Sequence, residues 1–571
     1  MHVVTTRRRY KGRVYSTHLL RRSYREDGRV KNETLGNLSH LPEPLLDVVR
    51  RSLRGETFVP AAVRLEILGS RAHGHVQAVR LAMQRVGIDS LIGSRASPER
   101  ERILALIAAR VLAPHTKLAT TRWWRTTTLA EEFGVAGADE DDLYAAMDWL
   151  LERQPHIERK LAARHLSEGS LALYDLSSSY FEGTHCPLGR IGYNRDRKKN
   201  KLQVNYGLMT TRVGCPISIS VYEGNTADAK TLMPQVSKLR EAFGLERVVL
   251  VGDRGMISHK AIGEIKNLEG MAWITALKSS QIRGLVEAGA LQLGLFDERN
   301  LFEVSHPNYP GERLIACRNP QLAKLRAHKR QALLQATTLE LDKIRERVER
   351  GALQGEAAIA LKLGRILDKY KVGKHFELSI TDTQLKYHIL ETQVAAEAAL
   401  DGIYVIRTSL PKKQMSAPDA VRSYKALAQV ERAFRSLKTV DLKIRPIHHR
   451  LESRVRAHIF LCMLAYYVEW HLIEAWRPLL FADEDQAAKA TRDPVAPAQR
   501  SAAALEKVHS HSNPEGMPVH SLRTLLEELA TLVRNTCRTP GAVAHQATFE
   551  ILTTPSALQR RAFELIDKIA V

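Results

Sequence analysis

The chain has 571 residues, enough for about three to five domains, which excludes a small disulfide-stabilised scaffold and a single binding module. Apolar residues make up 44% and charged residues 26%, so a chain that is disordered throughout is excluded as well. Lys and Arg number 85 against 63 Asp and Glu, and the resulting net charge of +22 predicts a polyanionic partner.

The sequence carries no signal for a membrane or for secretion. No uninterrupted apolar run reaches the ~18 residues of a membrane-spanning helix, and the N-terminus lacks the apolar segment of a secretory signal. The five cysteines are odd in number, scattered and without a CxxC spacing, which argues against a disulfide framework and a zinc ribbon. We therefore expect a cytoplasmic protein with reduced thiols and no membrane partner.

The positive charge is concentrated in three segments. Residues 1–31 hold ten Lys or Arg against two acids, residues 190–201 six against one, and residues 422–456 ten against three. A merely basic soluble enzyme would not need such clusters, so they favour a nucleic acid as the partner.

Residues 1–60 alternate polar and apolar residues around two turn signals. Lys11-Gly12 and Asp27-Gly28 provide residues that adopt the backbone of tight hairpin turns. The sequence therefore predicts a basic β-hairpin module at this end of the chain.

Residues 61–168 have helical periodicity. Ser97, Pro98 and Glu99 form a helix start ahead of an apolar run. The region could bind DNA through a helix-turn-helix that includes Trp123 and Trp124, or these tryptophans could belong to the core of an ordinary helical domain.

The pattern changes to α/β at residue 169. In residues 169–280, three β-rich runs precede alternating helices and strands, which predicts a mixed sheet with helices on its faces. Residues 281–400 interrupt this pattern with short strands around long charged helices, as in an inserted α+β domain. Residues 401–480 resume the α/β pattern, and residues 481–571 are predicted to be a linker and a helical tail.

Two aspartates follow apolar strand patterns. Asp175 ends the run Leu-Ala-Leu-Tyr-Asp, and Asp253 ends Val-Val-Leu-Val-Gly-Asp. A carboxylate at the end of a strand in an α/β domain lies where ligand crevices form, although aspartate is also a common turn residue. If the two strands are neighbours, the carboxylates could share a divalent cation such as Mg²⁺.

A third acid lies on a predicted helix. Tyr424, Glu431 and Lys438 are spaced by seven residues, so they share one helix face. A stripe that includes Phe434 can pack on the sheet and turn that face toward the aspartates. The alternative is a solvated face with an ordinary ion pair between Glu431 and Arg435.

Four separated blocks resemble a known family. The blocks are YDLSSSYFEG, VYEGNTADAKTL, VGDRGMIS and YKALAQVERAFRSLK followed by IRPIHH. They are similar, in the same order, to the DDE transposases of bacterial insertion sequences, and specifically to the IS-four-like group and its subfamily with a long insertion before the final Glu. The similarity runs from RSYREDGRVKNETLGNLSH to FEILTTPSALQRRAFELI.

The resemblance implies an RNase H-like core in which Asp175, Asp253 and Glu431 hold two Mg²⁺ ions, for which Mn²⁺ can substitute. It also implies a signature of Tyr, two residues, Arg, three residues, Glu, six residues and Lys. Tyr424, Glu431 and Lys438 match this signature, but Leu427 stands at the Arg position. The residues that could supply the missing phosphate contact are Arg422, Lys425 and Arg432.

Some relatives stack a flipped base on a tryptophan of the inserted domain. Residues 280–430 contain no Trp, so this role is absent or passes to another ring. The candidate rings are Phe296, Phe302, His306 and Tyr309.

We therefore expect a transposase that binds the terminal inverted repeats of its element and catalyses Mg²⁺-dependent strand cleavage and strand transfer. Its partners would be double-stranded end and target DNA and a second copy of the chain, in the bacterial nucleoid. The expected DNA contacts are Arg7, Arg8, Arg9, Arg254, Tyr424, Arg432, Arg435 and Lys438. The alternatives are a domesticated, non-catalytic DNA-binding protein and a standalone nuclease with the same core.

Overall fold

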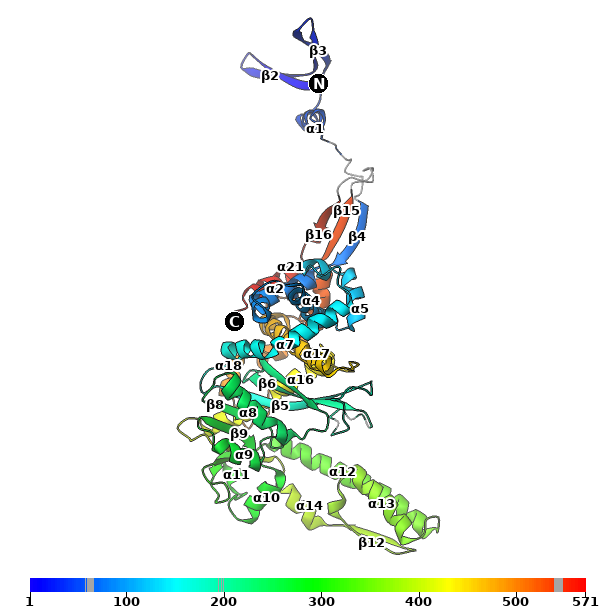
Figure 1. Ribbon diagram of the computed structural model, residues 1–571, viewed down its shortest axis with the longest axis vertical. Coiled ribbons are helices and arrows are strands. Elements are labelled where there is room, and N and C mark those ends of the chain that lie inside the picture. The colour runs from blue at the N-terminus through cyan, green and yellow to red at the C-terminus, as the bar shows by residue number, and fades with distance from the viewer. Residues whose placement is uncertain are drawn as a thin grey trace. The chain divides into compact units, whose positions relative to one another are not determined.

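The computed structural model describes residues 1–56, 58, 66–193, 195, 196, 198, 200–538 and 548–570 (Figure 1). The chain forms two compact units, one of Met1–Ser70 with Arg534–Leu552 and the other of Arg71–Val533 with Thr553–Val571. The boundary predicted between residues 60 and 61 lies outside the described residues, as do three positions of the basic segment 190–201. No single helix among the described residues is long and apolar enough to cross a membrane.

The first unit begins with three antiparallel strands, which confirms the predicted hairpins. The turn residues Lys11, Gly12, Asp27 and Gly28 all have positive φ, between 47° and 77°, as two-residue hairpin turns require. The strands β1 (His2–Tyr10), β2 (Arg13–Glu26) and β3 (Arg29–Asn37) are followed by α1 (Glu43–Leu53).

A second three-stranded sheet joins segments from both ends of the chain. Its order is β16-β15-β4, with β15 antiparallel to β16. Residues 66–72 were predicted to be helical and are a strand instead, because they pair with a segment more than 460 residues away that local periodicity cannot reveal. The strands are β4 (Glu66–Ala72), β15 (Val533–Arg538) and β16 (Phe549–Leu552).

The helical region follows β4, as predicted for most of residues 61–168. Ser97 caps the first long helix by accepting a hydrogen bond from the Arg100 N–H, and Trp124 is fully buried, so it is a core residue. The helices are α2 (Gly74–Arg85), α3 (Ile88–Ile92), α4 (Pro98–Leu112), α5 (Lys117–Trp123), α6 (Leu129–Glu132) and α7 (Glu140–His165).

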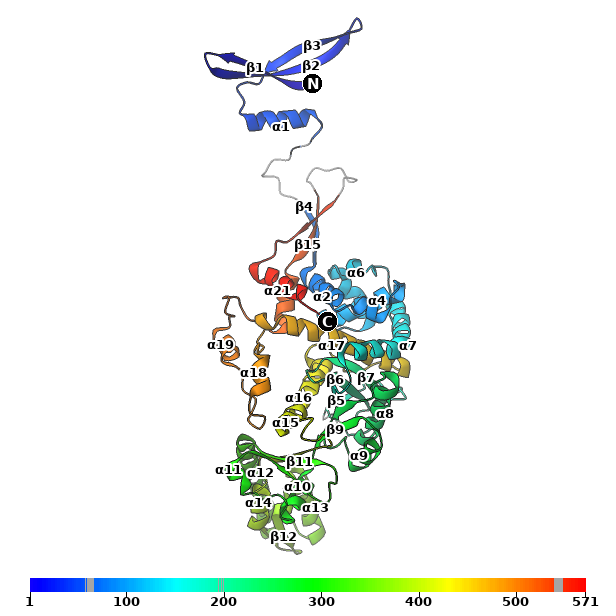
Figure 2. The same ribbon diagram turned by 90° about the vertical axis from the view of Figure 1, so that its left-hand side faces the viewer.

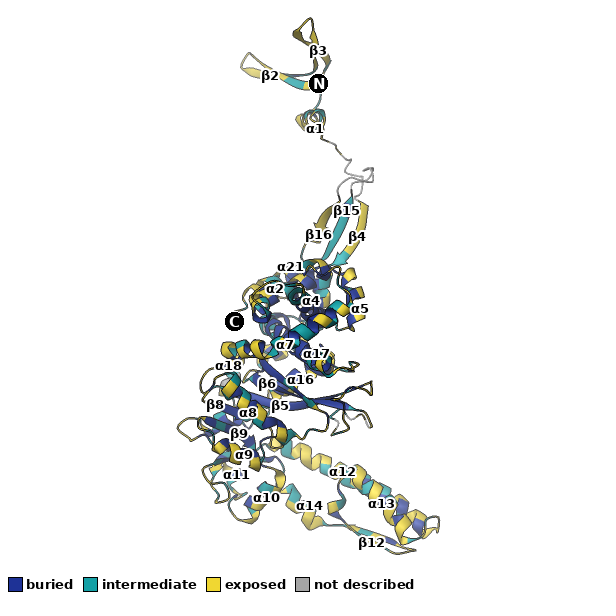
Figure 3. Ribbon diagram, in the orientation of Figure 1, coloured by how far each residue is buried: buried dark blue, intermediate teal, exposed yellow. Residues whose placement is uncertain are grey.

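The predicted mixed sheet is confirmed and has eight strands. Its order is β10-β11-β14-β9-β8-β5-β6-β7; β5, β6 and β7 are antiparallel neighbours, while β5, β8 and β9 run parallel. Figure 3 shows β5 and β6 as almost wholly buried. The strands are β5 (Leu171–Tyr180), β6 (Gln203–Thr211), β7 (Pro216–Glu223), β8 (Val248–Val251), β9 (Met271–Ala276), β10 (Leu301–Val304), β11 (Arg313–Arg318) and β14 (Ile403–Thr408).

The strands β10 and β11 lie within residues 281–400 but extend the main sheet. The pairing of β11 with β14 ends with Arg318 opposite Ile403, so the chain leaves the sheet after β11 and returns at the adjacent strand β14. The excursion has a core of its own, in which the two long helices predicted from the sequence lie side by side as a hairpin. Its elements are α12 (Pro320–Glu349), α13 (Glu356–Tyr370), β12 (Phe376–Ile380), β13 (Leu385–Ile389) and α14 (Glu391–Ala398).

The remaining helices cover the sheet and form the C-terminal part. The helix predicted to carry Tyr424 and Glu431 is broken at Ala426, and its second half packs on β5 and β6 (Figure 2). Residues 481–571, predicted to begin with a linker, contain two helices before residue 519. The helices are α8 (Leu232–Ser237), α9 (His259–Lys266), α10 (Ser279–Glu287), α11 (Leu295–Glu298), α15 (Ala417–Lys425), α16 (Leu427–Arg435), α17 (Glu452–Ala475), α18 (Gln486–Thr491), α19 (Ala502–Ser510), α20 (Leu522–Ala530) and α21 (Ala557–Asp567).

Candidate active site

Asp175 and Asp253 occupy equivalent positions relative to two neighbouring parallel strands. The pairing of β5 with β8 ends at Leu173 and Val251, and each aspartate lies two residues farther along the chain, Asp175 within β5 and Asp253 in the loop after β8. The strand predicted to end at Asp175 continues to Tyr180, because its other edge stays paired with β6. The opening between β5 and β8 therefore begins at the aspartates, as crevices do at the carboxyl ends of parallel strands.

Glu431 reaches the same place from helix α16. Val430, Ala433 and Phe434 bury one face of this helix against the sheet, and the Phe434 ring lies 5.8 Å from the ring of Tyr206 on β6. Glu431 lies between these anchors and is exposed, so its carboxylate faces the opening.

The three carboxylates line one cleft of about 450 Å³, which we call the acidic cleft. Among the described residues, none forms an ion pair with Asp175, Asp253 or Glu431. The ion pair between Glu431 and Arg435, the alternative to a site on this helix face, is therefore not formed, although Arg435 lines the cleft. The lining residues are Asp175, Leu176, Ser177, Tyr193, Arg195, Asp228, Asp253, Glu431, Phe434, Arg435 and Lys438.

The cleft strongly disfavours negative charge on Asp175. Burial raises the pKa of this carboxyl to about 7, opposed by the N–H of Leu176 and the charge of Arg195, while Asp253 and Glu431 raise it further. A divalent cation would relieve this repulsion, and carboxylate oxygens are the ligands that hard cations such as Mg²⁺ prefer. The residues present therefore fit a divalent metal site.

Tyr424 is held against this site by the break between α15 and α16. Its hydroxyl donates a hydrogen bond to Asp253 Oδ1 at 3.4 Å. Burial and the charge of Asp253 raise the pKa of Tyr424 above its ordinary value, so the phenol stays protonated and remains a donor.

Lys438 is placed differently from the expected exposed phosphate ligand. It is 9% exposed, it pairs with Asp196 at 2.6 Å, and it donates a hydrogen bond to Ser177 Oγ at 3.2 Å. Asp196 also pairs with Arg445. Lys438 therefore connects the helix to β5 and to the loop that follows it, and its positive charge is largely satisfied within the protein.

The residues that could replace the signature arginine are mostly engaged elsewhere. Leu427 is partly buried against the core. Arg422 pairs with Asp419 at 2.9 Å, and Lys425 donates to the carbonyl of Val495 at 3.2 Å, while Arg432 is exposed outside the cleft lining. None of these three cations lines the acidic cleft.

Arg195 is a cation of the cleft, beside Arg435 and Lys438, that was not predicted individually from the sequence. It lines the acidic cleft and pairs with Asp228 at 2.7 Å. It belongs to the basic segment 190–201, so the cluster of charge was the available signal, but nothing in the sequence distinguishes Arg195 from its neighbours.

The other predicted contact residues lie in several places. Arg254 is exposed directly after Asp253, and Arg7, Arg8 and Arg9 are exposed on β1 of the first unit. Of the candidate stacking rings, Phe296 and Phe302 are buried against each other at 4.7 Å, so they are core residues. His306 and Tyr309 are half-buried and pack together at 6.0 Å.

Comparisons with known proteins agree with these observations. A piggyBac transposase synaptic complex with hairpin DNA has 9% sequence identity and a TM-score of 0.33, over 80% of this chain and 79% of that chain; likeness at this level supports no conclusion. No curated protein sequence matches the chain. Residues 3–57 match the IS1634 family transposase, N-terminal domain, and residues 183–468, half of the chain, match the transposase DDE domain. The chain therefore belongs to the DDE transposases of insertion sequences and is a metal-dependent DNA-cutting enzyme.

Proposed function

We propose that Asp175, Asp253 and Glu431 are the catalytic residues and hold two Mg²⁺ ions, for which Mn²⁺ can substitute. The observation that carries this proposal is the equivalent position of the two aspartates, each two residues beyond the last paired residue of the parallel strands β5 and β8, with Glu431 facing the same cleft. The absence of an ion pair to any of them among the described residues supports it, since carboxylates that repel each other are stabilised by a metal.

The bound ions would lower the pKa of a nucleophilic water, align a 3′-hydroxyl and stabilise the leaving oxygen of an in-line displacement. The protein side chains position the ligands and the DNA. The Tyr424 hydroxyl orients Asp253 through its hydrogen bond. Arg195, Arg435 and Arg254 place positive charge in or beside the acidic cleft, where they can bind the phosphates of a strand that enters it.

The core is of the RNase H-like class. Three antiparallel strands followed by two parallel strands, in the order β7-β6-β5-β8-β9, support this assignment. The excursion between β11 and β14 precedes Glu431, as in the IS-four-like subfamily with a long insertion before the final Glu. In this division the core comprises residues 169–280 and 401–480, and residues 61–168 together with the β-hairpin module bind DNA.

The substrate is the pair of terminal inverted repeats of the element, which the enzyme cuts and joins to target DNA in the nucleoid. Arg7, Arg8 and Arg9 support end binding by the first unit, because all three are exposed on one strand. Two ends must be joined in one reaction, so we propose that a homodimer forms the synaptic complex.

Isosteric substitution of each carboxylate tests this proposal. Asp175→Asn, Asp253→Asn and Glu431→Gln should each reduce Mg²⁺-dependent nicking of an end-containing duplex by more than the ~10- to 100-fold that loss of an outer ligand contact costs. Binding of the duplex in a gel-shift assay should be unchanged. Asp228→Asn is the matched control, because Asp228 lines the cleft but pairs with Arg195. A variant of the three that nicks DNA near the wild-type rate would remove that residue from the metal site.

A further inference from the structure

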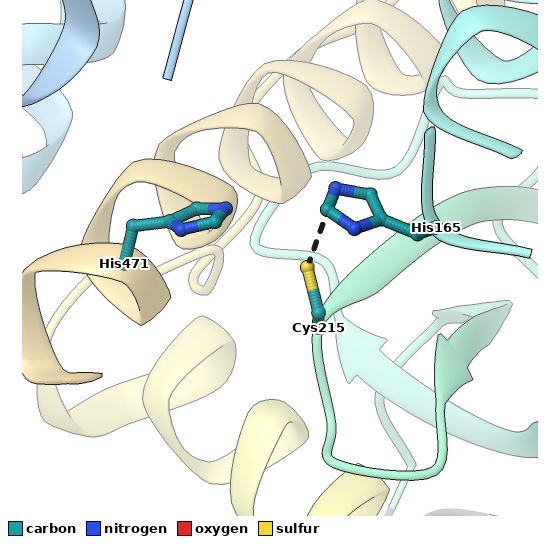
Figure 4. A group of neighbouring side chains, drawn as sticks. All are labelled: His165, Cys215 and His471. Atoms are coloured by element: carbon teal, nitrogen blue, oxygen red, sulfur yellow. Dashed lines mark hydrogen bonds between the residues drawn. The ribbon is translucent and has the colours of Figure 1, made fainter. Parts of the chain in front are cut away.

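A second group of ligand-type side chains lies away from the acidic cleft. His165 is the last residue of α7, Cys215 precedes β7, and His471 lies on α17 (Figure 4). One ring nitrogen of each histidine and the Cys215 Sγ lie within 4.8 Å of one another. None of the three is among the described residues that line the acidic cleft.

Two of the three side chains are buried, His165 is half-buried, and the group is incompletely hydrogen-bonded. Cys215 is 1% and His471 6% exposed, and the Nε2 atom of His471 has no hydrogen-bond partner among the described residues. Buried ring nitrogens normally have a partner, so this atom needs an explanation. His165 Nε2 and the Tyr467 hydroxyl share a hydrogen bond of 2.9 Å, and Cys215 Sγ lies 3.9 Å from the same nitrogen.

The surroundings hold the histidines in place and keep them neutral. The ring of His471 packs edge-on against Tyr467 at 4.7 Å and against Trp470 at 4.8 Å. Burial lowers the pKa of His165 to about 4 and that of His471 to about 3, so near pH 7 both are neutral imidazoles, the form that binds metals.

We propose that His165, Cys215 and His471 form a Zn²⁺ site, distinct from the acidic cleft. Imidazole nitrogen and thiolate sulfur are the ligands that zinc prefers, whereas Mg²⁺ prefers oxygen. In a tetrahedral zinc site these atoms lie roughly 3.3–3.6 Å apart, so the side chains need to close by about 1 Å. Cys215 binds as the thiolate and releases its proton to solvent, while the Tyr467 hydroxyl retains its hydrogen bond from Arg164 at 3.2 Å.

The three side chains line a cavity of about 590 Å³, which would leave room for a fourth ligand. Glu474 lines this cavity but is held by Arg477 at 2.5 Å, so we expect a water molecule to be the fourth ligand. The site joins the end of the helical region, the turn before β7 and the long buried helix α17. A metal at this junction would stabilise the packing of the helical region on the sheet.

Metal analysis of the full-length protein tests the proposal. The protein is stripped with a chelator, incubated with Zn²⁺ in excess Mg²⁺ to occupy the acidic cleft, and desalted before elemental analysis. We expect one retained Zn²⁺ per chain, a higher melting temperature, and a thiolate-to-metal charge-transfer band when Co²⁺ replaces Zn²⁺. The variants Cys215→Ala and His471→Gln should not retain the Zn²⁺ ion. The control variant Cys462→Ala, which removes a different buried thiol that lies on α17, should retain it.

A measurement on the wild-type chain guards against variants that do not fold. Zn²⁺ should slow alkylation of Cys215, read by peptide mass spectrometry, at least tenfold relative to Mg²⁺ alone. The proposal is overturned if the wild-type chain retains no Zn²⁺, if the Co²⁺ form lacks the thiolate band, or if alkylation of Cys215 is unchanged by Zn²⁺. Mg²⁺-dependent nicking reports on the acidic cleft separately, so failure at either site can be recognised.

Discussion

Replacing Asp175 by Asn should abolish cleavage and, without metal, make the protein more stable. The pKa of Asp175 is raised from its ordinary 3.8 to about 7, chiefly by burial. Three pKa units correspond to about 4 kcal/mol as an upper limit for the cost of ionising this carboxyl in the folded state. Because water can enter the cleft, we expect a gain of roughly 1–2 kcal/mol from an amide of nearly the same volume.

The sign of this effect depends on pH. Below about pH 4 the Asp175 carboxyl is protonated in both the folded and the unfolded chain, so its ionisation does not change the free energy of unfolding. As the pH rises from 4 to 7, the Asp175 carboxyl ionises in the unfolded chain but stays protonated in the folded chain. The stability of the wild type therefore falls relative to that of Asp175→Asn. Above pH 7 the carboxyl is ionised in both states, so the difference in free energy of unfolding between the wild type and Asp175→Asn is constant.

Chemical or thermal denaturation in chelator at pH 4 and pH 8 measures this difference. The variant should unfold later than the wild type at pH 8, and the two should nearly coincide at pH 4. Added Mg²⁺ should stabilise the wild type and leave Asp175→Asn unchanged, because only the former keeps the ligand. A variant that is less stable than the wild type at pH 8 would refute the reasoning, since the Asp175 charge would then have to be compensated inside the fold.

Three further predictions concern the helix of Glu431 and the basic strand β1. Lys438→Ala should lower the free energy of unfolding by ~1–3 kcal/mol as well as slow cleavage, because it removes an ion-pair partner of the buried Asp196. An unchanged urea midpoint would contradict the buried ion pair, and the exposed Arg432→Ala is the control for that midpoint. Phe434→Ala should cost ~3–5 kcal/mol through the cavity left against Tyr206, and an unaltered melting temperature would show that this ring is not an anchor. Replacing Arg7, Arg8 and Arg9 by Ala should reduce the slope of log affinity against log salt by up to about 2.7, measured by fluorescence anisotropy; an identical slope would place these arginines outside the DNA interface.

The sequence predicts the parts of the site that depend on local pattern. The apolar runs before Asp175 and Asp253 mark two strands, and the seven-residue spacing brings Glu431 to the face that meets them. Periodicity does not predict the register between β5 and β8. Only the pairing of Leu173 with Val251 places the two aspartates level with each other.

The features that were missed depend on contacts between distant segments. Lys438 has the pattern of an exposed lysine, and its burial follows from Asp196 in a loop more than 240 residues earlier. The strand β11 has the pattern of a short strand in an insertion, and its place in the main sheet follows from six residue pairs with β14. Neither partner can be chosen from local composition.

The excursion between β11 and β14 begins and ends at directly opposed residues. Arg318 faces Ile403 across the two strands, and the next N–H, of Asn319, donates to the carbonyl of Gly402 at 2.9 Å. Gly402 has a φ of +74°, and a Cβ at this position would lie 2.3 Å from the Asn319 oxygen, so only glycine permits this approach. The strand pairing thus closes the excursion at its base, so we expect that the helices beyond it can be lengthened, exchanged or replaced by a short turn without moving the sheet beside the proposed catalytic acids.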